Sequence, residues 1–136
     1  MPLAVSVVME TVKYDPLEKV AAGLIEEIPN VTTATFGDLV TSGIGPIAVE
    51  FMSYRCEYCR TLDPVLRRVA QLLSGKMTTL KVNIITDRDL ANRFNIHETP
   101  TLMMFLDGKI MGQTKGPHPT VENLLAVMQA PFPSLQ

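Results

Sequence analysis

The sequence contains no tryptophan, only two cysteines and only two histidines among its 136 residues. Two cysteines cannot form the several disulfides that hold together a small secreted scaffold. No apolar run approaches the roughly 20 residues that a helix needs to cross a bilayer, because Pro, Gly or a charged residue interrupts each candidate. The composition therefore argues against a disulfide-rich scaffold and against a membrane-spanning protein.

The sequence also has no large excess of charge of one sign, because it contains 12 Lys and Arg residues and 14 Asp and Glu residues. The basic residues are spread along the chain without interleaved aromatic residues, so we expect no binding to nucleic acid. The apolar stretch at 1–9 is not preceded by Lys or Arg and ends at Glu10, which makes it a poor signal peptide. We expect a cytoplasmic monomer that does not contact a membrane.

The length suits one compact domain with an extension. We expect an N-terminal extension at 1–30, a domain at 31–130 and a C-terminal tail at 131–136. In the extension, Asp15 and Pro16 have the residue types typical of an N-cap and a first helical position. They predict an amphipathic helix over 15–28, whose apolar face packs on the domain or on a second copy of it.

The periodicity of apolar residues in the domain predicts alternating strands and helices. We expect strands at 31–33, 47–51, 78–84, 101–106 and 109–114, and helices at 36–41, 56–73, 87–94 and 120–128. Helices between the first strands imply parallel pairing, whereas Asp107-Gly108 is a strong signal for a two-residue hairpin. The predicted fold class is α/β, with a mixed central sheet flanked by helices.

The two cysteines lie in Cys56-Glu57-Tyr58-Cys59, where a buried strand leads into a helix. The first turn of a helix has unpaired N–H groups that favour a negative sulfur, so we expect Cys56 to be the attacking thiolate. Cys59 lies one turn later on the same side and is expected to resolve the mixed disulfide. A lone pair of cysteines can also be half of a zinc site, but only His97 and His118 could complete it. We therefore expect no metal and no cofactor other than the redox-active disulfide.

Two charged residues occur inside apolar strands. Glu50 lies in the run 47–51 and is expected to be a partly buried carboxyl that accepts the proton of Cys59, the alternative being an edge charge that reaches solvent. Lys81 in the next strand either pairs with Glu50 or is an ordinary lysine on the strand surface. The sequence leaves these two interpretations of Lys81 equally open.

Residues from about Val31 to Met128 resemble a whole thioredoxin domain. The resemblance rests on the Cys56–Cys59 motif and on six further features in the same order. These are Glu50-Phe51, Pro64 in the helix after the cysteines, Lys81, Thr99-Pro100-Thr101, Asp107-Gly108 and Gly116.

The resemblance implies a thioredoxin fold and a thiol–disulfide oxidoreductase. It also implies that the Thr99-Pro100 bond is cis and faces the cysteines, with catalytic contributions from Glu50, Lys81 and Pro100. Tyr58, Thr99, Pro100 and Gly116 would then bind the substrate. The implied partners are protein disulfide substrates, with a disulfide reductase or a thiol pool as electron donor.

The sequence departs from the family pattern close to the cysteines. Glu57-Tyr58 replaces the usual Gly-Pro, and Met52 and Arg55 stand where tryptophans are usual. These departures leave room for a glutaredoxin-like or isomerase-like redox protein. A thioredoxin-fold module that binds a partner or carries a metal without turnover is a further alternative.

Overall fold

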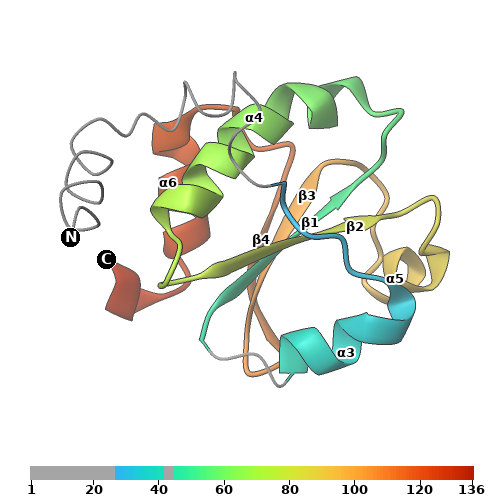
Figure 1. The fold of residues 1–136 in the computed structure, drawn as a ribbon, viewed down its shortest axis with the longest axis horizontal. Helices are drawn as coiled ribbons and strands as arrows, with labels where there is room; N and C mark the ends of the chain where they lie inside the picture. Colours follow the sequence, from blue (N-terminus) through green and yellow to red (C-terminus); the bar gives the residue numbers. More distant parts are fainter. Residues whose placement is uncertain (1–26, 42–44) are drawn as a thin grey trace, which may run out of the picture.

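A computed structural model describes residues 27–41 and 45–136 (Figure 1). The predicted helix at 15–28 lies almost wholly outside these described residues. The elements follow the order α3 (Thr33–Thr41), β1 (Ile47–Met52), α4 (Glu57–Leu72), β2 (Thr78–Asn83), α5 (Arg88–Arg93), β3 (Thr101–Leu106), β4 (Lys109–Lys115), α6 (Val121–Gln129) and the 3-10 helix η1 (Pro133–Leu135). None of these described helices combines the length and apolar character that a membrane span requires.

The four strands form one mixed sheet in the order β2-β1-β3-β4. β1 pairs in parallel with β2 through the α4 crossover, and it pairs in antiparallel fashion with β3. β3 and β4 form the predicted hairpin, whose turn residues Asp107 and Gly108 have positive φ values of 52° and 80°. Asn, Asp and Gly tolerate this conformation best, which explains why the turn forms at Asp107-Gly108.

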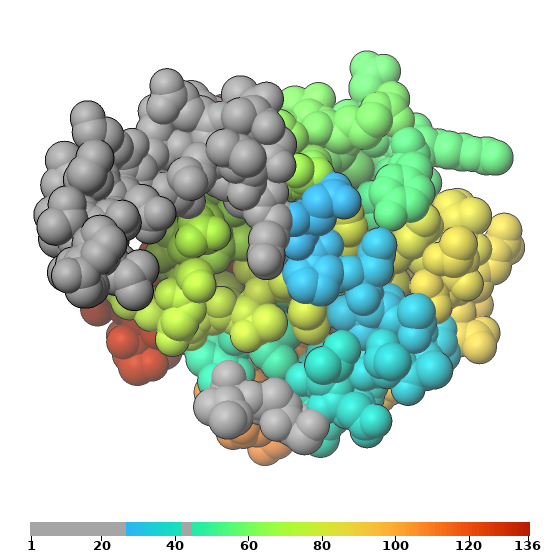
Figure 2. Space-filling view, in the orientation of Figure 1, coloured from blue at the N-terminus to red at the C-terminus, as the bar shows by residue number. Residues whose placement is uncertain are grey.

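Helices cover both faces of the sheet, with α4 and α6 on one face and α3 and α5 on the other (Figure 1). Every residue of β1 is buried, as expected of an apolar run in a strand covered on both sides. Val49 and Phe51 point towards α3 and α5, which lie next to each other on the face shown in Figure 2. Ala48 points towards α4 and α6, and so does Glu50, two residues further along the strand.

The predicted strand at 31–33 is wrong. Only an isolated bridge joins Asn30 to Lys81, and α3 begins at Thr33, three residues before the predicted start. The cause is local hydrogen bonding, because the Thr32 N–H donates to Thr35 Oγ1 at 3.1 Å and the Phe36 N–H donates to Thr32 O at 2.9 Å. Thr32 thus begins a helix immediately after the bridge. The bounds of the other predicted elements within the described residues agree to within one residue.

The outer strand β4 has an irregular register. Met104 of β3 pairs with Gly112 and Phe105 pairs with Ile110, so Met111 has no partner in β3. Such an extra residue bends a strand and increases its twist. Ile110 and Met111 are exposed on this edge, at 51% and 44%.

Candidate active site

The two cysteines lie where β1 leads into α4, as the sequence predicts. Cys56 is the N-cap of α4 and Cys59 lies in its first turn, and the two form a disulfide with their Cα atoms 5.2 Å apart. The Cys59 N–H donates to Cys56 Sγ at 3.1 Å. Cys56 is partly exposed, whereas Cys59 is only 3% exposed. A second molecule can therefore reach the sulfur of Cys56, while that of Cys59 is shielded.

The loop before β3 faces the cysteines. The Thr99-Pro100 bond is cis, which confirms the prediction, and Thr99 O lies 3.5 Å from Cys56 Sγ. The Gly116 N–H donates to Pro100 O at 2.8 Å. Three of the predicted substrate-binding residues therefore lie together beside Cys56.

Tyr58 connects the start of α4 to the loop after β4. Its hydroxyl donates to Pro117 O at 2.8 Å, and its ring lies against Gly116. A Cβ atom at Gly116 would meet the Tyr58 ring at 3.5 Å, and the φ of Gly116 is +52°. Sequence reasoning placed Tyr58 in the substrate site but missed Pro117, because this hydrogen bond joins residues 59 positions apart.

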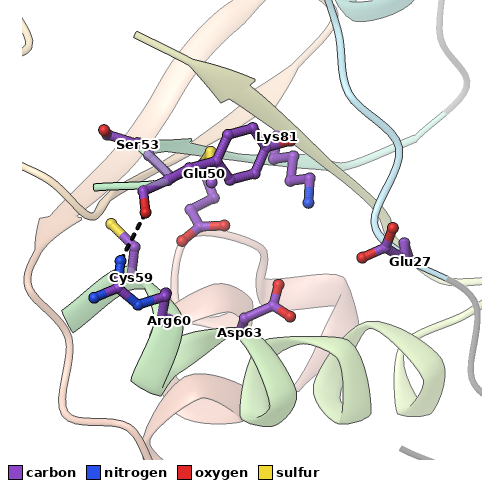
Figure 3. Close-up of a pocket in the computed structure, with 9 residues that line it drawn as sticks. Glu27, Glu50, Ser53, Cys59, Arg60, Asp63 and Lys81 are labelled. Atoms are coloured by element: carbon purple, nitrogen blue, oxygen red, sulfur yellow. Dashed lines mark hydrogen bonds between the residues drawn. The ribbon is translucent and has the colours of Figure 1, made fainter. Parts of the chain in front are cut away.

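Glu50 points from β1 into a cavity of about 230 Å³ behind Cys59 (Figure 3). Its side chain is 2% exposed, so the alternative of an edge charge that reaches solvent is wrong. Burial raises the pKa of Glu50 to about 7, the nearby charge of Asp63 adds to this rise, and the charge of Lys81 opposes it. Oε2 of Glu50 has no hydrogen-bond partner in the described part of the chain. The carboxyl can therefore exchange a proton near neutral pH.

Lys81 pairs with Glu50 in the register of β1 and β2. It is 5% exposed, so an ordinary lysine on the strand surface is excluded. Its Nζ lies 5.8 Å from the centroid of the Tyr54 ring, and Figure 3 shows the ammonium directed away from the Glu50 carboxyl. Lys81 therefore acts on Glu50 through its charge rather than through direct contact.

Sequence reasoning missed Asp63, which also lines the cavity. Asp63 follows Cys59 by four residues on α4, a spacing that places both on one face of a helix. Its Oδ2 lies 2.9 Å from Nε of Arg67. The helical spacing from Cys59 was the signal that could have revealed it.

The two histidines and the two arginines that flank the cysteines differ in their surroundings. His97 and His118 are exposed, and no group of three or more His, Cys, Asp or Glu residues among those described is arranged to hold a metal ion. Arg55 is exposed, whereas Arg60 lines the cavity and donates from Nη1 to Tyr54 O at 2.7 Å.

Comparison with known proteins agrees with this geometry. Residues 27–130 match the sequence model of the family described as Thioredoxin. The chain is 36% identical over 85 residues to a thioredoxin of Pseudomonas aeruginosa, covering 62% of this chain and 79% of that protein. It is 35% identical over 97 residues to thioredoxin 1 of Synechococcus elongatus, covering 70% of this chain and 91% of that protein.

A mixed sheet flanked by helices, with a disulfide at the N-terminus of the helix after its central strand, defines a thiol–disulfide oxidoreductase. The chain belongs to the thioredoxin family. Its redox group is the Cys56–Cys59 disulfide.

Proposed function

We propose that the protein reduces disulfides in other proteins, with Cys56 as the attacking sulfur and Cys59 as the resolving sulfur. The observation that carries this assignment is the difference in exposure between the two cysteines at the start of α4. As a thiolate, Cys56 would be stabilised by the helix N-terminus and by the N–H of Cys59. It attacks a substrate disulfide, forms a mixed disulfide and releases the first substrate sulfur as a thiolate.

Glu50 is the proposed proton acceptor for the second step. Cys59 gives its proton to the Glu50 carboxylate, and its sulfur attacks Cys56 Sγ to restore the protein disulfide. The second substrate sulfur leaves as a thiolate. The support is the position of Glu50, which shares a cavity with Cys59 and has a pKa of about 7. Lys81 assists by limiting the rise of that pKa.

The loops beside Cys56 are the proposed substrate groove. An extended segment of the substrate would pair with the backbone of Thr99, next to Pro100, and run between Gly116 and the exposed part of the Tyr58 ring. The contact of Thr99 O with Cys56 Sγ and the packing of Tyr58 on Gly116 support this placement. A disulfide reductase or a thiol pool would then return the protein to its dithiol form.

The proposed working unit is a cytoplasmic monomer. The support for the location is cysteine usage, because a single closely spaced pair suits catalysis in a reducing compartment better than structural stabilisation. We also propose the division into an extension at 1–30, a domain at 31–130 and a tail at 131–136.

The experiment is the reduction of a model protein disulfide by the dithiol form of the protein. Cys56→Ser abolishes the reaction, whereas Cys59→Ser accumulates a mixed disulfide that mass spectrometry detects. Activity that survives in Cys56→Ser would contradict the assignment. Elemental analysis of the reduced monomer distinguishes the metal-carrying alternative, which requires zinc at one equivalent.

A further inference from the structure

One face of α4 carries a line of chemically active side chains. Cys59, Asp63 and Arg67 follow one another at intervals of four residues, which places them above one another along the helix. Cys59 and Asp63 both line the cavity into which Glu50 points. Figure 3 shows the Glu50 carboxyl descending from β1 between Cys59 on one side and Asp63 on the other.

Asp63 is held in place by an ion pair at the outer end of this line. Nε of Arg67 lies 2.9 Å from Asp63 Oδ2, and the same guanidinium also pairs with Glu27. The side chains of Asp63 and Arg67 are 29% and 18% exposed, so the pair is partly shielded from water. The Arg67 cation is shared between the carboxylates of Asp63 and Glu27.

The charged and titratable groups around Glu50 come from four parts of the chain. These are Cys59, Arg60, Asp63 and Arg67 on α4, Lys81 on β2, Tyr54 after β1 and Glu27 before α3. Both cations lining the cavity interact with Tyr54: Arg60 donates to its backbone carbonyl, and the Lys81 ammonium lies over its ring. Asp63 is therefore a nearby charge whose effect on Glu50 these cations do not cancel.

We propose that Asp63 is a positioning residue for the Cys59 step: fixed by Arg67 beside Glu50, it determines when Glu50 is ionised and able to take the proton of Cys59. The inference rests on the proposed role of Glu50 as proton acceptor. The negative charge of Asp63 disfavours a second negative charge on Glu50 within the same cavity.

The role matters because the transfer needs Glu50 to be ionised and basic at the same pH. The S–H bond of Cys59 breaks, the proton moves to a Glu50 oxygen and the electron pair stays on sulfur. That sulfur bonds to Cys56 Sγ, and the substrate thiolate leaves with the electrons of the broken S–S bond. A fully protonated Glu50 could not accept the proton, while a strongly acidic Glu50 would be a poor base.

The direct test follows the ionisation of Glu50 by NMR of its carboxyl carbon in the oxidised protein, where the disulfide-bonded cysteines do not titrate. Asp63→Asn is expected to increase the acid ionisation constant of Glu50 about tenfold, which moves its titration midpoint about one pH unit downwards. Arg67→Gln is expected to move the midpoint upwards, because Asp63 then loses its counterion. The control is Asp107→Asn in the β3–β4 turn, which removes the same charge at a φ of 52° that Asn tolerates.

The pH dependence of disulfide reduction provides the second readout. Because ionisation of Cys56 also makes the overall rate rise with pH, the comparison uses the second step alone, from the mixed disulfide to the released substrate thiol. In Asp63→Asn the rise of this second-step rate with pH should begin at lower pH, and in Glu50→Gln that rise should be lost. An unchanged Glu50 midpoint in Asp63→Asn, or shifts of the same sign in Asp63→Asn and Arg67→Gln, would overturn the inference. A rise that persists in Glu50→Gln would instead overturn the proton-acceptor role of Glu50, so the two failures are distinguishable. If Asp63→Asn does not fold, the Glu50 midpoint in Arg67→Gln still tests the inference: an upward shift supports it, and an unchanged or lower midpoint overturns it.

Discussion

The two faces of the sheet are built on different principles, although the same strands contribute to both. On the α3 and α5 face, Phe36, Phe51, Phe94 and Phe105 form a cluster with ring centroids between 5.3 and 5.9 Å apart. The α4 and α6 face also has an apolar core, but the end nearest the cysteines contains Glu50, Lys81 and a cavity. One face is packed throughout with apolar side chains, and the other gives up some packing to hold a buried carboxyl beside a cavity.

The largest expected effect is on the aromatic face. Phe105 is 1% exposed and packs against Phe36 and Phe94, so Phe105→Ala should lower the free energy of unfolding by about 3–5 kcal/mol. Denaturant unfolding measures this loss. The titration midpoint of Glu50 in the folded variant should stay unchanged, and a shift would show that the two faces are coupled.

The next effect concerns Glu50 and has a defined sign. Its pKa is about 7 in the folded protein against an ordinary value of 4.5, so between these pH values the folded state binds the extra proton. Stability therefore falls as pH rises through this window, by about 3 kcal/mol in total, and is constant with respect to this group below and above it. In Glu50→Gln this dependence should disappear. Urea unfolding of both proteins at several pH values tests the expectation. The same dependence of the unfolding free energy on pH in both proteins would contradict it.

A smaller effect is expected at Tyr58. Tyr58→Phe removes the hydrogen bond to Pro117 but keeps the ring on Gly116, so the free energy of unfolding should fall by about 1 kcal/mol. Thermal unfolding measures this change. If the ring alone shapes the substrate groove, disulfide reduction by folded Tyr58→Phe stays close to that of the original protein. Tyr58→Ala is the matched variant that removes the ring as well.

The smallest effect concerns Glu57, an exposed acidic residue in the first turn of α4. Its carboxylate repels a negative sulfur on Cys56, although solvent screens the interaction. Glu57→Gln should therefore raise the thiolate-to-thiol ratio of Cys56 at neutral pH, but by less than about tenfold. Ultraviolet absorbance of the thiolate gives the ratio directly. An unchanged or lower ratio would show that the carboxylate points away from Cys56.

The fold could be predicted largely from local patterns. The apolar run of β1, the spacing of apolar residues in α4 and the Asp107-Gly108 turn each define their element within a few neighbouring residues. The prediction of a strand at 31–33 did not anticipate that the hydroxyl groups of Thr32 and Thr35 favour an early helix start.

The site was predicted only in part, because its other contacts join distant parts of the chain. The sequence indicates that Glu50 and the cysteines meet at the end of β1. It does not show that Lys81 is buried with its ammonium over the Tyr54 ring, or that Tyr58 reaches Pro117. These partnerships depend on how loops close over the sheet, and no periodicity encodes that.

In a crowded solution, the outer edge of β4 is where a second molecule could extend the sheet. A regular edge strand presents a row of unpaired N–H and C=O groups that can recruit another strand. The unpaired Met111 interrupts that row, and Lys109 and Lys115 at the two ends of β4 would bring like charges together if two copies paired. These features of β4 thus disfavour edge-to-edge pairing of two copies through this strand.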